Sequence, residues 1–370
     1  MSPPVGPRRF ERPSLREAAG YVPGEQPESG EVIKLNTNEN PYPPAPAVKT
    51  ALTVFDLDRL RRYPQPTALD FRRVAAALHG VDAEAIIAAN GSDELLRLAF
   101  ATFVEPGETV GILTPSYSLY PVLAELHGAR VAEVPLAEDW TPPGDVAARL
   151  NAARAKLVFV VNPHAPSGTL LAPGPVASLA DAFEGVVVLD EAYVDFVDPA
   201  SGYDSMPLVR SHDNVLVLRT LSKGYSLAGL RFGYGIGAPG VVEPMQTKTK
   251  DSYNTDVLSQ VLAVAALESR EYAQSTWRAV REERARLAAR LADLGLPCEP
   301  SQANFLLARV PEGWAGLERP AAGGLYRRLK AAGILVRYFA SAPLEGRLRI
   351  TIGNPDENEQ LLACIRHHAS

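Results

Sequence analysis

The chain has 370 residues, of which 46% are hydrophobic and 22% charged, and its formal net charge is −6. This length suits two domains of ordinary size, and the composition is that of a packed globular protein. The acidic balance argues against general binding of nucleic acid, which requires a basic surface. No stretch approaches the roughly 20 apolar residues of a membrane helix, so we expect neither a nucleic acid nor a membrane as partner.

The two cysteines, Cys298 and Cys364, lie in separate segments without the spacing of metal ligands. They make neither a disulfide framework nor a zinc site, so a reducing compartment is the default and no metal is expected. The first residues contain arginine but no apolar run behind it, which argues against a secretory signal. The sequence therefore predicts a cytoplasmic protein.

The first 50 residues are rich in Pro and Gly, which indicates an extended segment. We predict that residues 1–60 form an N-terminal arm and that this arm packs with the C-terminal domain. A helical pattern over about 67–80 ends at Gly80, and Ser92 is a candidate N-cap for the helix that follows it. Continuously apolar runs then alternate with helices, which is typical of strands buried on both faces of a mostly parallel sheet. The predicted strands lie in EAIIAAN, ETVGILTP, AKLVFVVN, GVVVLDEA, NVLVLRT and LRFGYGIG. We therefore predict a large α/β domain over residues 61–265.

Around residues 256–295 the pattern changes to a charged amphipathic stretch, which indicates one long helix or two consecutive ones. Three later segments, ANFLLARV, GILVRYF and GRLRITIG, read as strands, with a helix at about 323–332 between the first two. They predict a smaller α+β domain over residues 266–370.

The sharpest motif is RTLSKGYSLAGLR, residues 219–231, in which Lys223 follows an apolar strand. Partial desolvation lowers the pKa of such a lysine and favours Schiff-base chemistry. Thr220, Ser222 and Arg231 could hold a phosphate near it. Taken alone, the pattern also fits a surface lysine in a Ser/Gly loop.

A second motif, VVVLDEAYVDF, places Asp190 after four apolar residues and Tyr193 three residues later. A semi-buried carboxylate needs a positive or protonated partner, and a pyridinium nitrogen would serve. Tyr193 could then donate to the phenolate of the same ring. The alternatives are a metal-binding Asp–Glu pair or a helix N-cap at Asp190.

Three further motifs follow predicted strands. NGSDE contains Gly91, Ser92 and Asp93, where a glycine turn opens a helix and offers backbone N–H groups to an anion. TPSYSLY contains Tyr117, which could stack on an aromatic ring. VNPHAPSG begins at Val161 and is again a strand followed by a Pro/Gly turn. Each motif is weak alone, but together they place a phosphate cradle, a ring stacker, an acid, a phenol and a lysine at successive strand ends.

In this order the motifs resemble those of fold-type I aminotransferases, and the details are similar to the histidinol-phosphate branch of that family. KLNTNENPY, RRYPQP, SQANFLLAR, GILVRYF and LRITIG match that branch, so the resemblance covers nearly the whole chain from about Tyr21. It implies a large domain with a mostly parallel sheet flanked by helices and a smaller α+β domain. It also implies pyridoxal 5'-phosphate as cofactor.

The resemblance implies a role for each matching residue. Lys223 would bind the cofactor as a Schiff base and move the substrate proton, Asp190 would pair with the pyridine nitrogen, Tyr193 would bond the ring oxygen, and Tyr117 would stack on the ring. The phosphate would be held by Gly91, Ser92, Asp93, Ser222 and Arg231, with Thr220 as a possible addition.

Groups toward the substrate follow from the same resemblance. Tyr63 would reach the cofactor phosphate of the other subunit, which implies a homodimer. Arg349 would clamp the substrate α-carboxylate in a bidentate pair. Arg337 and Tyr21 would lie near the substrate phosphate. Asn38 and Asn40 fall in the matching N-terminal segment without an assigned role.

The chain departs from the family at one motif. Where many members read NPNNPTG, residues 162–168 read NPHAPSG, so the asparagine that usually bonds the ring oxygen falls at Ala165. Either His164 or Asn162 takes over this contact, or Tyr193 bonds the ring oxygen alone. His164 is equally well read as an exposed loop histidine.

The implied reaction is amino transfer between L-histidinol phosphate and 2-oxoglutarate, giving imidazole-acetol phosphate and L-glutamate by ping-pong kinetics. The partners are thus a small-molecule amino donor and a 2-oxo acid acceptor. The alternatives are an aromatic (Phe/Tyr) aminotransferase and a phosphothreonine-type decarboxylase on the same scaffold. A regulatory cofactor-binding module is a further class, but the sequence leaves no basic segment for a DNA-binding domain.

Overall fold

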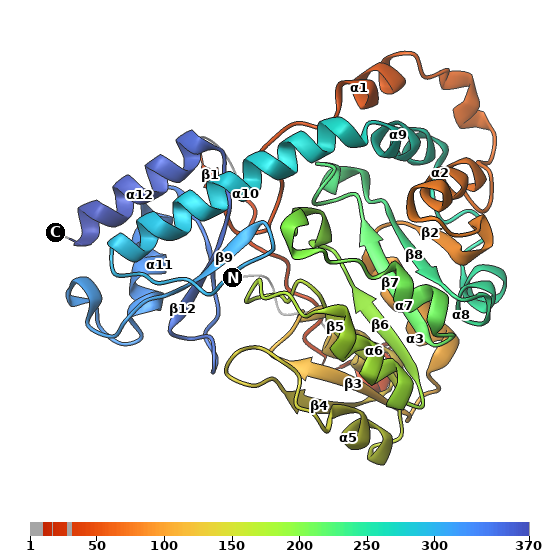
Figure 1. The fold of residues 1–370 in the computed structure, drawn as a ribbon, viewed down its shortest axis with the longest axis horizontal. Coiled ribbons are helices and arrows are strands. Elements are labelled where there is room, and N and C mark those ends of the chain that lie inside the picture. The colour runs from red at the N-terminus through yellow and green to blue at the C-terminus, as the bar shows by residue number, and fades with distance from the viewer. Residues whose placement is uncertain (1–9, 17, 28–31, 370) are drawn as a thin grey trace.

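A computed structural model describes residues 10–16, 18–27 and 32–369, so the first nine residues of the predicted arm lie outside this part of the chain. The fold is built on a seven-stranded sheet flanked by helices, with a smaller sheet to one side of it (Figure 1). The long helix α10 (Arg270–Asp293) runs from the large sheet region to the small one (Figure 1).

The large sheet is mostly parallel, as the sequence predicts. Its strand order is β2-β8-β7-β6-β5-β3-β4, and only β8 runs antiparallel to its neighbours. The bounds are β2 (Ile86–Ala89), β3 (Thr109–Thr114), β4 (Arg130–Pro135), β5 (Ala155–Val161), β6 (Val186–Asp190), β7 (Val215–Thr220) and β8 (Gly233–Gly237). The sequence does not predict β4, because this edge strand is largely exposed and has no continuous apolar run.

Both faces of the large sheet are buried, which explains the apolar runs of its central strands. In β6, Val187 and Leu189 join one hydrophobic core whereas Val188 joins another, and all three are fully buried. Side chains alternate across a sheet, so the two cores lie on its two faces. The covering helices are α1 (Pro46–Thr53), α2 (Leu69–His79), α3 (Ser92–Phe103), α4 (Leu119–His127), α5 (Val146–Ala152), α6 (Pro173–Ala182), α7 (Met206–Ser211), α8 (Pro239–Pro244) and α9 (Val257–Glu268).

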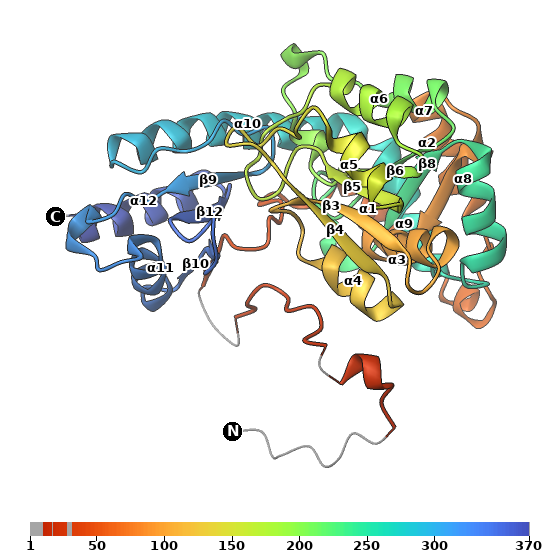
Figure 2. The same cartoon turned by 90° about the horizontal axis from the view of Figure 1, so that it is seen from below.

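Short helical turns occupy several connections. They are the 3-10 helices η1 (Pro13–Leu15), η2 (Leu57–Arg61), η3 (Ala83–Ala85), η4 (Val194–Phe196), η5 (Pro199–Ser201), η6 (Ala228–Leu230) and η8 (Trp314–Gly316), and the π-helix η7 (Met245–Thr249). Figure 2 shows η1 beside α4, where Arg12 donates to the carbonyl oxygen of Leu126 over 3.1 Å.

The predicted N-cap of α3 is wrong by one residue. Gly91 takes the N-cap position with φ +79°, a conformation that glycine adopts without steric cost, and Ser92 is the first helical residue. Gly91 provides no side-chain cap, and the Glu94 carboxylate accepts from the backbone N–H of Asn90.

The amphipathic stretch forms two helices, α9 and α10, which meet at Ser269. Beyond α10, β9 (Phe305–Arg309), β12 (Arg347–Thr351) and β11 (Arg337–Tyr338) form a small antiparallel sheet. Helices α11 (Ala321–Ala331) and α12 (Pro355–Ala369) accompany it.

The segment GILVRYF forms two short strands rather than one. β10 (Ile334–Leu335) pairs in parallel with β1 (Ile33–Lys34), whereas β11 joins the small antiparallel sheet. The N-terminal segment is thereby hydrogen-bonded to the C-terminal part of the chain. The domain boundaries at residues 60 and 265 stay predictions. Within the described ranges, no helix is long and apolar enough to span a bilayer.

Candidate active site

The residues predicted to carry the chemistry lie at one edge of the large sheet. Asp190 is the last residue of β6, whereas Lys223 and Tyr117 each follow a strand by three residues. Arg231 precedes β8, which begins at this edge because it runs antiparallel. The carboxyl ends of parallel strands are where open α/β sheets bind ligands, so the topology gathers these side chains at a ligand-binding edge.

Lys223 is partly buried and faces the N-terminal segment. Its Nζ donates to the carbonyl oxygen of Thr37 over 2.8 Å. Burial, and after it the positive charge of Arg349, lowers the pKa of this amine to about 8, whereas Glu39 opposes the shift. Removal from water disfavours the charged ammonium, so the neutral, nucleophilic amine is populated near neutral pH.

Asp190 is a buried carboxylate with 5% of its surface exposed. It accepts from the Tyr120 hydroxyl over 2.8 Å and from the backbone N–H of Ala192 over 3.1 Å. Burial raises its pKa to about 6, although these two donors oppose the shift. Among the described residues no cation forms an ion pair with it, so a protonated ring nitrogen would provide the missing partner.

Tyr193 projects from the loop after β6 and is held from two sides. Its ring packs edge-on against Phe305, with 5.0 Å between the centroids. Its hydroxyl accepts from Nδ2 of Asn38 over 3.0 Å. Burial raises the pKa of Tyr193, so the phenol stays protonated and can act as a donor. The sequence analysis does not predict the contact with Asn38, because no motif spacing relates two residues that are 155 positions apart.

The predicted phosphate cradle surrounds the start of α3. A Cβ on Gly91 would lie 2.7 Å from Nη2 of Arg231, so only glycine leaves this approach open. Arg231 lies 3.4 Å from both the Asp93 carboxylate and the Ser222 hydroxyl. The Thr220 hydroxyl accepts from the backbone N–H of Ser222 over 3.1 Å. Ser92 and Asp93 open the helix, where backbone N–H groups lack intrahelical partners and attract anions.

The three tyrosines predicted to approach the cofactor or substrate belong to two aromatic pairs. Tyr117 donates to Asp93 over 3.4 Å, and its ring meets Tyr21 edge-on at 5.8 Å between centroids. Tyr63 is 80% exposed and stacks on Tyr253, with centroids 4.4 Å apart and planes inclined by 12°. In one chain Tyr63 therefore points into solvent rather than into the cradle formed by Gly91 and Arg231.

Two arginines lie side by side on neighbouring strands of the small sheet. Arg337 of β11 and Arg349 of β12 are direct partners in the antiparallel register. Arg349 donates to the carbonyl oxygen of Asn36 over 3.1 Å and lies against Phe305, 5.3 Å from the ring centroid. Its Nε is buried without a partner among the described residues. A buried, unpaired guanidinium nitrogen is costly, and a substrate carboxylate would satisfy it.

The residues considered as replacements for the missing asparagine point elsewhere. The buried Asn162 donates to Leu171 and to Tyr203, both over 2.8 Å, and accepts from the Leu171 N–H. His164 is buried rather than exposed, and its ring nitrogens contact the Ser167 hydroxyl at 2.7 Å and the Pro115 carbonyl at 2.9 Å. The amide of Asn162 is thus committed to other partners in this structure, and its predicted contact with the cofactor stays a prediction.

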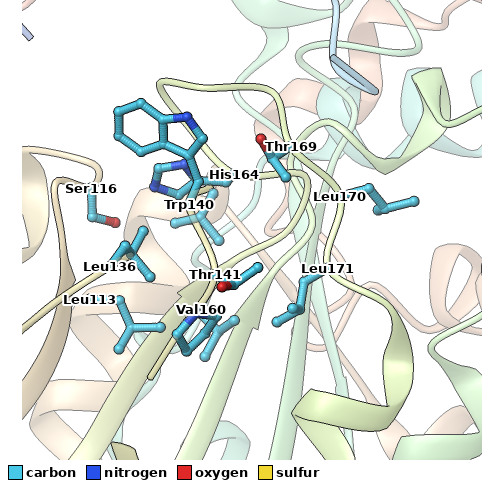
Figure 3. A pocket seen from close by; sticks show the side chains of 12 residues that line it. Leu113, Ser116, Leu136, Trp140, Thr141, Val160, His164, Thr169, Leu170 and Leu171 are labelled. Carbon is cyan, nitrogen blue, oxygen red and sulfur yellow. The ribbon is translucent and has the colours of Figure 1, made fainter. Parts of the chain in front are cut away.

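His164 lines a pocket together with Trp140, whose indole lies beside its ring (Figure 3). The two rings stack with centroids 5.7 Å apart, and burial lowers the pKa of His164 to about 4. The pocket is mostly apolar, with Leu113, Leu136, Val160, Leu170 and Leu171 in its wall. His164 is therefore a neutral structural residue that supports the turn after β5.

These features match what pyridoxal phosphate requires. The site offers a partly buried amine, a buried acid without a cationic partner, and a glycine turn beside an arginine at a helix N-terminus. They correspond to the aldehyde, the pyridine nitrogen and the phosphate of that cofactor. The chain matches the model of aminotransferases of class I and II over residues 30–365, and it belongs to this family.

Relatives within the family are more specific. The histidinol-phosphate aminotransferase of Synechocystis sp. is 44% identical over 96% of this chain and 97% of its own length. Histidinol-phosphate aminotransferase 1 of Nostoc sp. is 42% identical with the same coverage. The structure resembles that of histidinol-phosphate aminotransferase from Sinorhizobium meliloti in complex with pyridoxal-5'-phosphate, with a TM-score of 0.88 and 26% identity over 98% of both chains.

Proposed function

We propose that this chain is a histidinol-phosphate aminotransferase that uses pyridoxal 5'-phosphate. It transfers the amino group of L-histidinol phosphate to 2-oxoglutarate and forms imidazole-acetol phosphate and L-glutamate. The observation that carries the proposal is Lys223, whose amine has a pKa of about 8 and lies at the same sheet edge as the buried Asp190. Two relatives of this name, 44% and 42% identical over nearly the full length, support the choice of substrate.

Each part of the cofactor has candidate ligands in this site. Asp190 would hold the pyridine nitrogen in its protonated form, and Tyr193 would donate to the ring oxygen. Gly91, Ser92 and Asp93 would offer backbone N–H groups to the phosphate, with Ser222, Thr220 and Arg231 beside them. Tyr117 would lie against the ring. When bound, the cofactor withdraws electrons from the substrate carbon that loses its proton.

Lys223 does the proton chemistry. With a pKa of about 8, roughly one lysine in ten is neutral at pH 7, whereas an ordinary lysine is almost entirely charged. The neutral amine is the form that would hold the cofactor and would be released when the substrate amine binds. With the cofactor bound, the Nζ of Lys223 would take the proton from the substrate carbon as a general base and would then donate it as a general acid.

The two amino compounds use different cations. L-glutamate has an α-carboxylate, which would satisfy the unpaired Nε of Arg349. L-histidinol phosphate lacks that carboxylate and carries a phosphate, for which Arg337 and Tyr21 are candidates. Since Arg337 lies opposite Arg349 in the sheet, one site can accept both compounds in turn, as ping-pong kinetics requires.

The enzyme is proposed to act as a homodimer in the cytoplasm. Tyr63 is 80% exposed and belongs to a surface that also carries the exposed Leu57 and Leu60. Exposed apolar side chains in one area are typical of an interface, and pairing would let Tyr63 reach the partner's phosphate cradle. Both cysteines are free, as in proteins of a reducing compartment.

The half-reaction tests the substrate assignment. The protein is loaded with pyridoxal phosphate, an amino donor is added without any 2-oxo acid, and the absorbance of the bound cofactor is followed. We expect L-histidinol phosphate to convert it to pyridoxamine phosphate at lower concentration than phenylalanine or phosphothreonine. A stronger response to phenylalanine would make the enzyme an aromatic aminotransferase, and release of carbon dioxide from phosphothreonine would make it a decarboxylase.

Matched lysine variants test the role of Lys223 in the same assay. Lys223→Ala should lower turnover by about four orders of magnitude or more, since one group provides attachment and proton transfer. Lys248→Ala, which alters an exposed lysine, should leave turnover unchanged. Substantial turnover by Lys223→Ala would contradict the mechanism.

A further inference from the structure

Asn38 is a buried residue of the N-terminal segment whose side chain reaches the hydroxyl of Tyr193. It is 1% exposed, and its Nδ2 donates to that hydroxyl over 3.0 Å. Its backbone lies in the left-handed region with φ +57°, which asparagine tolerates better than most residues. The family resemblance assigns it no role.

The surroundings of Asn38 fix which end of its amide faces Tyr193. The Thr351 hydroxyl accepts from the backbone N–H of Asn38 over 3.0 Å, so its own hydrogen is free to donate to Oδ1 of Asn38, 3.1 Å away. Oδ1 is thereby occupied, and Nδ2 is directed at Tyr193. Asn304 holds the Asn38 carbonyl oxygen over 2.9 Å, and the Thr351 N–H donates to Leu35 over 2.9 Å. The segment is thus held on β12.

The orientation of this amide determines what Tyr193 can do. Because the tyrosine oxygen accepts from Asn38, its hydrogen is left for a different acceptor. If the amide were reversed, Oδ1 would accept that hydrogen and take it away from any ligand. The other side chains considered for this region are committed elsewhere, since Asn162 bonds Leu171 and Tyr203, whereas His164 bonds Ser167 and Pro115.

We propose that Asn38 is a positioning residue that holds Tyr193 as a donor to the ring oxygen of the cofactor, and that it replaces the function of the asparagine absent at position 165. This inference rests on the proposed function. Thr351 fixes the orientation of the Asn38 amide, and Asn38 in turn orients the hydroxyl of Tyr193.

The consequence is a lower pH for loss of the proton at Lys223 Nζ when the cofactor is attached. That proton is shared with the ring oxygen, and a second donor to this oxygen reduces its hold on the proton. A Tyr193 hydroxyl that is well placed therefore favours the deprotonated form. Loss of Asn38 loosens the hydroxyl, so deprotonation should require a higher pH.

The test is a pH titration of the absorbance of the cofactor-loaded protein without substrate. Asn38→Gly removes the amide, adds no charge, and suits the positive φ of this position. The pH at the midpoint of this titration should be higher in Asn38→Gly than in the unaltered protein, by about half a pH unit to one pH unit. Tyr193→Phe should raise the midpoint more, and Asn38→Gly should add nothing in the Tyr193→Phe background, because both act on one contact.

Variants of the neighbouring residues separate this role from a general loosening of the segment. Thr351→Val should raise the midpoint, since the amide can then reverse, whereas Thr351→Ser keeps the hydroxyl and should restore the original midpoint. Asn40→Ala is the matched control, because Asn40 lies two residues away and contacts Gly224 and Thr276 at 3.4 Å instead of Tyr193. Its midpoint should not move.

The outcomes distinguish this inference from the proposed function. If Tyr193→Phe moves the midpoint but Asn38→Gly does not, the inference fails alone. Additive shifts in the double variant, or an equal shift in Asn40→Ala, would also overturn it. If the unaltered protein forms no absorbance band with pyridoxal phosphate, the proposed function fails and the inference fails with it.

Discussion

The two ends of the site differ in how far a single chain completes them. At the ring end, Asp190 is 5% exposed and Tyr193 is bonded to the buried Asn38. At the phosphate end, Tyr63 is 80% exposed, and the side chain of Arg231 is 47% exposed. One chain therefore encloses the groups that would hold the ring, whereas Tyr63 and Arg231, which are assigned to the phosphate, stay exposed.

The two ends are suited to two different tasks, which are control of protonation and binding of charged groups. The ring end tunes protonation by burial, which requires exclusion of water and fixed hydrogen bonds. The phosphate end would bind charged groups, and a partly exposed arginine such as Arg231 suits this task. If a second subunit supplies Tyr63, the open end is closed by association rather than by folding. The predictions below test this division.

After Lys223→Ala, the largest effect is expected at the ring end, from Asp190→Asn. The amide has nearly the same shape but cannot hold a protonated ring nitrogen, so turnover should fall by about 10²- to 10³-fold. Steady-state kinetics with saturating cofactor measure this loss. Unchanged turnover would show that Asp190 does not face the ring nitrogen.

The same variant has an opposite effect on the stability of the cofactor-free protein. The pKa of Asp190 is about 6 in the folded chain and 3.8 in the unfolded one, so above pH 6 folding bears the cost of a buried charge. Asp190→Asn should therefore increase the free energy of unfolding above pH 6, by up to about 3 kcal/mol, with no gain below pH 4. Denaturant unfolding at pH 4 and pH 7 checks this, and a destabilised variant at pH 7 would contradict it.

The next effect concerns the open end, where Arg337→Met separates the two amino donors. It should lower kcat/KM for L-histidinol phosphate about 10- to 100-fold more than for L-glutamate, because only the former offers a phosphate. Arg327→Met alters an exposed arginine of α11 and serves as the matched control. Equal losses for both donors would refute the assigned division between Arg337 and Arg349.

The pH dependence of cofactor capture probes the burial of Lys223. Capture needs the neutral amine, so the rate should rise about tenfold between pH 7 and pH 9 and then level off, as its pKa of about 8 requires. Stopped-flow absorbance after mixing the cofactor-free protein with pyridoxal phosphate gives this profile. A rate that still climbs tenfold between pH 9 and pH 10 would indicate an ordinary, solvated lysine.

The smallest effect is expected from Tyr63→Phe, which removes one hydroxyl from the open end. Cofactor binding should weaken about five- to tenfold, as for one hydrogen bond to a charged group. Tyr253→Phe keeps the stacked pair and should bind normally. A protein that is monomeric by light scattering, with unchanged binding in Tyr63→Phe, would contradict the shared site.

Asp190 and Lys223 can be located from local sequence, because Asp190 ends one buried strand and Lys223 follows another, and the apolar runs of both strands are easy to recognise. The strand β4 escapes such prediction because its residues are mostly exposed. The N-cap of α3 is misplaced because Gly91 adopts a backbone conformation that the serine pattern does not reveal.

The contact between Asn38 and Tyr193 could not be predicted, since it depends on how the N-terminal segment docks on β12, 313 residues away from Asn38 at Thr351. His164 could not be assigned either. Its burial under Trp140 depends on the packing of a loop from a different strand.

The central claim is tested most directly by full turnover with both substrates. L-histidinol phosphate and 2-oxoglutarate are varied together, and L-glutamate is measured as product. We expect one glutamate for each histidinol phosphate consumed and parallel double-reciprocal plots, as amino transfer through a modified enzyme requires. Failure to form glutamate from histidinol phosphate, while phenylalanine serves as an efficient donor, would contradict it.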